Sequence, residues 1–144
     1  MRFWRISNFA DLSGAGGALY ASRWNRKGLP AVYLADHPST ALLETLVHFR
    51  SVNLPGTFQL LAVDAPDLVS IHRAELSVDW TSRVSLTRKI GSEFLEMGDF
   101  ALMRVPSIIM PQACNFLMNP QHPEAKQIHI AQTWRYPFDS RLLT

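Results

Sequence analysis

The feature that most constrains the fold is the irregular order in which strand-like and helix-like segments follow each other. Residues 39–50 and 83–97 show the apolar spacing of amphipathic helices, and Gly98 stands where the second helix should end. Short apolar runs bounded by Pro, Gly and Asp predict strands at 31–35, 58–63, 68–72, 100–105 and 127–130, with a short apolar element at 113–118. Because these segments lack a regular βαβ rhythm, we expect a mixed α/β or α+β fold rather than a doubly wound parallel sheet.

The stretch SGAGG at residues 13–17 predicts a flexible loop that lets the backbone approach a ligand. It matches neither the phosphate-binding P-loop nor the dinucleotide glycine pattern, since neither GK[ST] nor GxGxxG follows a strand. The glycines alone therefore do not identify a ligand.

Length and composition indicate one compact domain over residues 1–144. The chain has 144 residues, of which 47% are hydrophobic and 18% charged, as in ordinary globular proteins. The single cysteine, Cys114, has no partner for an internal disulfide, which favours a reducing compartment and a small buried apolar role. No apolar run reaches the roughly 20 residues that span a bilayer, and the N-terminus lacks a signal-peptide pattern. The expected location is the cytoplasm, with no membrane partner.

The charge pattern argues against a long polyanionic partner. The formal net charge is only +2, and 11 of the 14 basic residues are arginines scattered along the chain. A guanidinium holds a phosphate or carboxylate as a bidentate fork, whereas lysine acts as a hydrated point charge. The pattern favours a small phosphorylated ligand over a nucleic acid, although most of these arginines also fit a solvated surface.

Four residues carry candidate chemistry, and each has a plain alternative. In the strand at 31–35, the two-residue period puts Tyr33 on the face opposite its apolar neighbours, toward a cleft or toward solvent. Glu44 lies on the flank of the first helix, where glutamates are usually solvated. Arg23 can form a surface cation–π pair with Trp24, and Ser107 can be a simple turn residue. Taken singly, none identifies a function.

Together these segments resemble a known family. The run SRWNRKGLPAVYLADHPSTALLETLVH, followed by IGSEF, MRVPSIIMPQACNFLMNPQHP and FDSRLL, is similar to the RES domain over nearly the whole chain. This domain is the toxin half of the RES–Xre bacterial toxin–antitoxin systems. The resemblance implies an ADP-ribosyltransferase-like fold with a split mixed sheet, and consumption of NAD⁺ as substrate without a metal.

The resemblance also assigns residues. By position, the family's arginine is Arg23, its strand tyrosine is Tyr33, its glutamate is Glu44 and its serine is Ser107. Arg23 is expected to hold the pyrophosphate, and Tyr33 to pack on nicotinamide or ribose. We expect Glu44 to stabilise positive charge that develops on the ribose, and Ser107 to bond the nicotinamide amide or the ribose.

Further assignments are weaker. Trp24 and Asn115 are expected to help bind NAD⁺, and His48 to stand nearby, although core or surface roles fit each of the three as well. One departure from the family pattern is Ser22, which stands where glycine commonly precedes the arginine. A side chain at this position is expected to affect affinity rather than the type of reaction.

The resemblance implies an Xre-type antitoxin that covers the NAD⁺ cleft, and either a homodimer or a toxin–antitoxin hetero-oligomer. Two other classes stay open: an RNA-targeting toxin, and a catalytically inactive binding module of the same fold. The absence of a basic stripe with interleaved aromatic residues argues against the first. The acceptor of the ADP-ribose moiety, whether water, phosphate or protein, is left open by the sequence.

Overall fold

The computed structural model describes residues 1–49 and 54–143. Its strands are β1 (Arg2–Ile6), β2 (Val32–Ala35), β3 (Thr57–Asp64), β4 (Ile71–Arg73), β5 (Leu102–Pro106), β6 (Cys114–Met118) and β7 (His129–Pro137). The α-helices are α1 (Ala15–Leu19), α2 (Pro38–Leu46) and α3 (Val84–Met97), and the short 3₁₀ helices are η2 (Trp80–Ser82), η3 (Pro123–Gln127) and η4 (Ser140–Leu143).

The strands form a seven-stranded sheet in the order β4-β5-β6-β2-β1-β3-β7. Strands β4 and β5 run parallel, and the other neighbouring pairs are antiparallel. At the junction of β1 and β2 the only register pair is Trp4 with Ala35, whereas β1 pairs with β3 along its whole length. The sheet is therefore split at β1/β2, and the expected mixed α+β fold with a split mixed sheet is confirmed.

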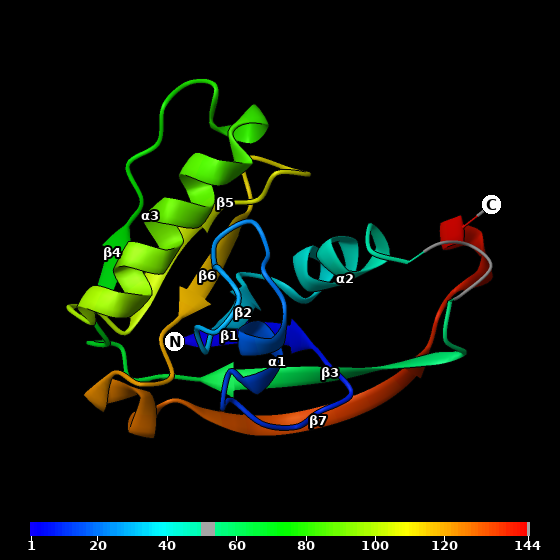
Figure 1. The fold of residues 1–144 in the computed structure, drawn as a ribbon. Helices are drawn as coiled ribbons and strands as arrows, with labels where there is room; N and C mark the ends of the chain where they lie inside the picture. The colour runs from blue at the N-terminus through cyan, green and yellow to red at the C-terminus, as the bar shows by residue number, and fades with distance from the viewer. Residues whose placement is uncertain (50–53, 144) are drawn as a thin grey trace.

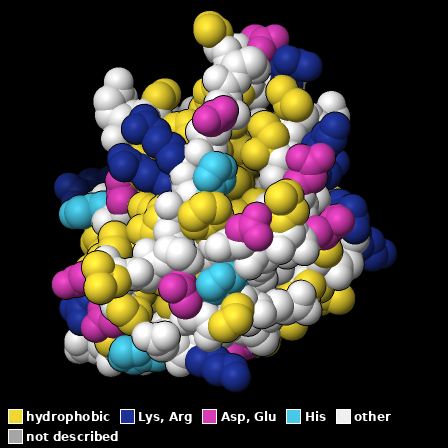
Figure 2. All heavy atoms as spheres, turned by 90° about the vertical axis from the view of Figure 1, so that its left-hand side faces the viewer, with side chains coloured by type: hydrophobic (Ala, Val, Ile, Leu, Met, Phe, Trp, Pro, Cys, Tyr) yellow, Lys and Arg dark blue, Asp and Glu magenta, His cyan; other side chains and the backbone are white. Residues whose placement is uncertain are grey.

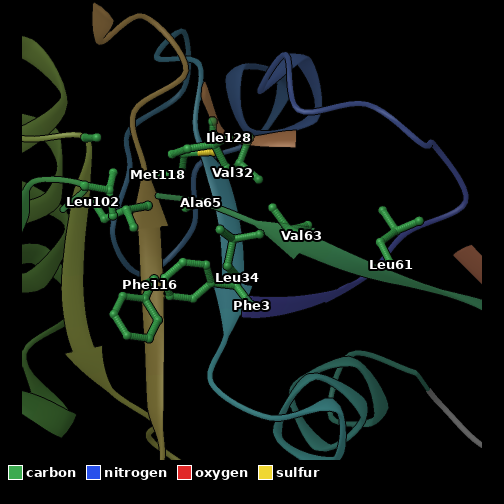
Figure 3. Packing of buried hydrophobic residues seen from close by; sticks show 12 residues of the cluster. Phe3, Val32, Leu34, Leu61, Val63, Ala65, Leu102, Phe116, Met118 and Ile128 are labelled. Atoms are coloured by element: carbon green, nitrogen blue, oxygen red, sulfur yellow. The ribbon is translucent and has the colours of Figure 1, made fainter. Parts of the chain in front are cut away.

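Each face of the sheet has its own hydrophobic core. On one face Phe3, Leu34 and Phe116 pack with residues of β3 and β5, and the rings of Phe3 and Phe116 meet edge to face at 4.7 Å (Figure 3). On the other face α3 covers the β5–β6 side of the sheet, where Phe94 and Leu95 contact buried side chains of these strands (Figure 1). The alternation of side chains along β2 sends Val32 and Leu34 into the first core and Tyr33 to the second face.

The helix predicted at 83–97 is confirmed as α3. It ends at Gly98, whose φ of 68° is the left-handed conformation that glycine adopts without steric cost. A Cβ at Gly91 would lie 1.8 Å from the carbonyl oxygen of Trp24, so only glycine lets α3 approach the chain at this point. The helix therefore docks directly on the backbone segment that carries Arg23.

Several predicted boundaries were wrong. Residues 15–17 of the loop expected at 13–17 belong to α1, and the N-terminal strand β1 was not predicted. The strand expected at 68–72 is β4, shifted to Ile71–Arg73, and the strand expected at 127–130 extends as β7 to Pro137. Helix α2 ends at Leu46, earlier than expected, and Arg50 lies outside the described residues. In the described ranges, no helix is both long enough and apolar enough to cross a membrane.

Candidate functional site

A cleft of about 570 Å³ opens where the sheet splits. Its wall combines residues of β1 and β2, one side of α2, the segment from Gly16 to Trp24, and the segment that follows β5. Among the sequence-predicted residues, the cleft wall includes Arg23, Trp24, Tyr33, Glu44, His48 and Asn115. The volume lies within the range of small-molecule sites.

Glu44 is the anchored acidic group of this cleft. It projects from α2, which packs on β1 and β2, and its Oε1 accepts hydrogen bonds from Ser107 Oγ and Asn115 Nδ2, each at 2.7 Å. Among the described residues, no hydrogen bond reaches the second oxygen, Oε2. The carboxylate is thus fixed through Oε1, and Oε2 is the oxygen left for a ligand in the cleft.

Ser107 lies behind the carboxylate rather than on the cleft wall. Only 1% of its surface is exposed, and its Oγ accepts hydrogen bonds from the backbone N–H groups of Ile109 and Met110, both at 3.2 Å. Because the single hydroxyl proton is given to Glu44, the contacts of Ser107 are all within the protein. The structure brings Ser107 to Glu44, across 63 residues of sequence, instead of exposing it to a ligand.

Tyr33 belongs to a second polar cluster at the other side of the cleft. Its hydroxyl donates to Asn25 Oδ1 at 2.5 Å and contacts Ser22 Oγ, which in turn donates to Asn25 Oδ1 at 2.5 Å. Burial raises the pKa of the Tyr33 phenol to about 12, although the hydrogen bond from Ser22 and the charge of Arg88 act in the opposite direction. Tyr33 is therefore a neutral donor at physiological pH.

Arg23 is held through its backbone by α3. Thr87 Oγ1 donates to the carbonyl oxygen of Arg23 at 3.0 Å, and Arg88 Nε donates to the carbonyl oxygen of Ser22 at 2.8 Å. The Arg23 guanidinium lies 5.9 Å from the ring centre of Trp80 and donates to the carbonyl of Thr81. The prediction that Arg23 forms a cation–π pair with Trp24 was wrong, because the Trp24 ring is buried in the core.

The remaining predicted residues differ in exposure. Trp24 is 4% exposed and packs against Trp80 with ring centres 6.0 Å apart, so its contribution to the cleft is small. His48 is exposed on the cleft wall. Asn115 reaches Glu44 from β6, at the position paired with Ala35 of β2.

Sequence reasoning missed two residues of this region. Arg5 of β1 is one of the cleft residues, and its Nε is buried without a hydrogen-bond partner among residues 1–49 and 54–143. Burial lowers the pKa of this guanidinium, and the charge of Asp11 only partly opposes the effect. Asn25 is completely buried beneath the turn that carries Arg23. A strand that places an arginine among apolar residues was the available signal for Arg5.

The comparison with known proteins identifies the family. Residues 2–139 match the RES domain. The chain belongs to the RES domain family. It is 43% identical to the protein named Toxin Res of Pseudomonas putida KT2440 over 145 residues, covering 99% of each chain. It is 38% identical to the Prs ADP-ribosylating toxin of Sphingobium sp. YBL2 over 156 residues, covering 98% of this chain and 96% of that protein.

A solved structure shares the RES fold. The crystal structure of the M. tuberculosis MbcT–MbcA toxin–antitoxin complex contains a chain that matches with a TM-score of 0.75 and 18% sequence identity. The match covers 94% of this chain and 84% of that one. The resemblance inferred from the sequence motifs is therefore confirmed at the level of family and fold.

Proposed function

We propose that this RES domain is the toxin of a toxin–antitoxin pair and that it cleaves the bond between nicotinamide and ribose in NAD⁺. The observation that carries the proposal is the carboxylate of Glu44, held at Oε1 by Ser107 and Asn115 on the wall of a cleft of about 570 Å³. A fixed carboxylate in a cleft is the arrangement that this bond cleavage requires.

The chemistry follows from the charge that develops in the reaction. As nicotinamide leaves, positive charge builds on the ribose, and a nearby carboxylate stabilises this transition state more than the ground state. The two hydrogen bonds to Oε1 orient Glu44 before the substrate arrives, so little reorganisation is needed during the reaction. In this proposal Oε2 faces the ribose, and Ser107 and Asn115 act as positioning residues.

The other cleft residues suit the remaining parts of a dinucleotide. Arg23 supplies a guanidinium group for the pyrophosphate. Tyr33 supplies an aromatic surface for the nicotinamide ring.

The direct test is to incubate the purified protein with NAD⁺ and measure free nicotinamide. Glu44→Gln should fold normally and lose roughly 10²-fold or more in kcat, with a much smaller change in KM. The matched control is Glu75→Gln, which changes an exposed glutamate outside the cleft wall and should keep the wild-type rate. Release of nicotinamide by Glu44→Gln at the wild-type rate would refute the proposed role.

The same experiment separates the alternative classes. Cleavage of added RNA without loss of NAD⁺ would indicate an RNA-targeting toxin, and loss of neither would indicate an inactive binding module. On the face shown in Figure 2, the Lys and Arg side chains of the described residues are interrupted by acidic and hydrophobic ones and form no continuous stripe. This distribution favours the small-ligand proposal over RNA binding.

The acceptor of the ADP-ribose moiety is a separate part of the proposal. The name of the Sphingobium relative, an ADP-ribosylating toxin, favours transfer to a protein over release to water or phosphate. Mass spectrometry of the products from labelled NAD⁺, with and without phosphate and cell lysate, distinguishes the three. A label that appears only on free ADP-ribose would exclude transfer.

The proposed partner is an Xre-type antitoxin that covers the cleft in the cytoplasm. Exposed apolar residues stand near its mouth: Val47 and Ile108 belong to the cleft wall, and Met110 follows in the same turn. A partner that packs on these side chains would remove them from water and block substrate entry. Expression of this chain alone should arrest growth, and co-expression of the antitoxin should restore it; growth with soluble protein alone would contradict the toxin proposal.

A further inference from the structure

The hydroxyl of Tyr33 lies against two polar side chains, those of Ser22 and Asn25. Asn25 Oδ1 lies 2.5 Å from both the Tyr33 hydroxyl and Ser22 Oγ, and the two hydroxyls also contact each other. All three groups lie between the turn that carries Arg23 and the end of the cleft formed by β2. We call Ser22, Asn25 and Tyr33 the hydroxyl–amide cluster.

The orientation of Asn25 follows from its surroundings. The side chain has an exposed fraction of 0%, and its Nδ2 lies 2.8 Å from the carbonyl oxygen of Gly17, 3.2 Å from that of Arg26 and 3.3 Å from that of Tyr20. Carbonyl oxygens only accept hydrogen bonds, so the amide nitrogen must face them and Oδ1 must face the two hydroxyls. Asn25 Oδ1 is thus an acceptor with no alternative orientation.

The orientation of Asn25 determines which group accepts the hydrogen bond from Tyr33. The phenol carries one proton, and its high pKa, caused mainly by burial, keeps that proton in place at neutral pH. Because the proton is donated to Asn25 Oδ1, it is not available to donate to a ligand in the cleft. What Tyr33 contributes to the cleft wall is then its ring.

We propose that Ser22 and Asn25 are positioning residues that hold the Tyr33 ring in one orientation, so that a flat aromatic ring of the ligand packs against it. This inference rests on the proposed function and specifies the contact with the pyridinium ring of NAD⁺. Asn25 also joins the Tyr33 ring to the backbone of Gly17 and Tyr20, so the glycine-rich wall of the cleft and the tyrosine are fixed together. Ser22 adds a second hydroxyl to this arrangement.

A double-mutant cycle on Ser22→Ala and Tyr33→Phe tests the proposal. Each single variant removes the contact between the two hydroxyls and one of the two hydrogen bonds to Asn25 Oδ1, so the ring is held less firmly. Each should therefore raise KM for NAD⁺ by about threefold to tenfold with kcat changed by less than about twofold. The double variant should raise KM by less than the product of the two single effects, because each single variant already removes the contact between the two hydroxyls. Tyr20→Phe, which removes an exposed hydroxyl outside the cluster, is the matched control and should keep the wild-type KM.

The cycle is also measured on unfolding in urea, which needs no NAD⁺. The two substitutions should be non-additive by at least about fivefold in the unfolding equilibrium constant, as expected for side chains in contact. Effects on KM that multiply would mean that the two hydroxyls act independently, and would overturn the proposal. Coupling in unfolding without coupling in KM would equally overturn it, because the cluster would then be structural only.

Failure of the proposed function gives a different result. If the wild-type protein releases no nicotinamide, NAD⁺ cleavage is refuted, whereas the unfolding cycle still reports whether Ser22 and Tyr33 are coupled. Asn25→Ala is less suitable for the main test, because the loss of a completely buried amide can prevent folding. The two hydroxyl variants change far less of the structure.

Discussion

Asn115→Asp gives a sharp test of the geometry around Glu44. Asn115 Nδ2 lies 2.7 Å from Glu44 Oε1 and donates a hydrogen bond to it. The substitution replaces this donor with a second carboxyl group of nearly the same shape. Two carboxylates at this separation repel each other by about 6 kcal/mol at an effective dielectric constant of 20.

The pair can avoid this repulsion by binding one proton. Holding a proton at pH 7 on a carboxyl with an ordinary pKa near 4 costs about 4 kcal/mol, at about 1.4 kcal/mol per pH unit. Because this is less than the repulsion, the pair should be protonated once in the folded protein, and the new O–H should replace the lost N–H donor. The pKa of the pair is thereby raised above its value in the unfolded chain.

The sign of the pH dependence follows from proton binding. Above a pH of about 4, the folded variant binds one more proton than the unfolded variant, so its stability falls as the pH rises. Relative to wild type, the free energy of unfolding of Asn115→Asp should fall by about 3 to 4 kcal/mol between about pH 4.5 and about pH 7.5. Asn115→Ala removes the donor without adding charge, and its difference from wild type should not depend on pH.

Urea unfolding followed by circular dichroism at several pH values measures these differences. A difference between Asn115→Asp and wild type that stays constant within about 0.5 kcal/mol across this range would refute the contact between Asn115 and Glu44. The experiment needs no substrate, so it tests the geometry independently of the proposed reaction.

Three further predictions concern the groups around the cleft. Arg5→Met should leave the free energy of unfolding unchanged or raise it by about 1 kcal/mol, because a buried Nε without a partner among the described residues is removed; a clear loss of stability would contradict this. Gly91→Ala should destabilise the protein by more than about 3 kcal/mol in thermal unfolding, because the new Cβ would lie 1.8 Å from the carbonyl oxygen of Trp24. The control Gly56→Ala, whose Cβ would have nothing within 4 Å, should change the stability by less than about 0.5 kcal/mol in the same assay. Ser107→Ala should lower the free energy of unfolding by about 2 kcal/mol and reduce kcat without a matching rise in KM, and wild-type kinetics would refute its positioning role.

The sequence predicted those parts of the fold that depend on local pattern. The alternation around Tyr33 assigned it to the face opposite Val32 and Leu34, and the apolar spacing of α3 with Gly98 fixed that helix to within one residue. β1 and the far end of β7 were missed because their side chains are mostly half-buried or exposed, so apolar alternation is weak there. These two segments form strands because they pair with β3, which is distant from both in sequence.

The sequence predicted which residues belong to the candidate site, but not the contacts between them. Family motifs indicated Arg23, Glu44 and Ser107, and the structure brings all three to one region. That Ser107 points at Glu44 could not be predicted, because the contact joins residues 63 positions apart and depends on the turn after β5. The orientation of Asn25 likewise depends on three carbonyl groups from α1 and the following turn, which no short pattern encodes.

These long-range contacts connect the fold to the proposed chemistry. Glu44 stands on a helix over the junction where the sheet splits, and the groups that hold its carboxylate come from β6 and from the turn after β5. Arg23 depends on α3, which packs on that same β5–β6 side. The Glu44 hydrogen bonds join α2, which packs on β1 and β2, to β6 and to the turn after β5. Because the same contacts orient the carboxylate for a cationic transition state, a substitution at Ser107 or Asn115 should change stability and kcat together rather than either one alone.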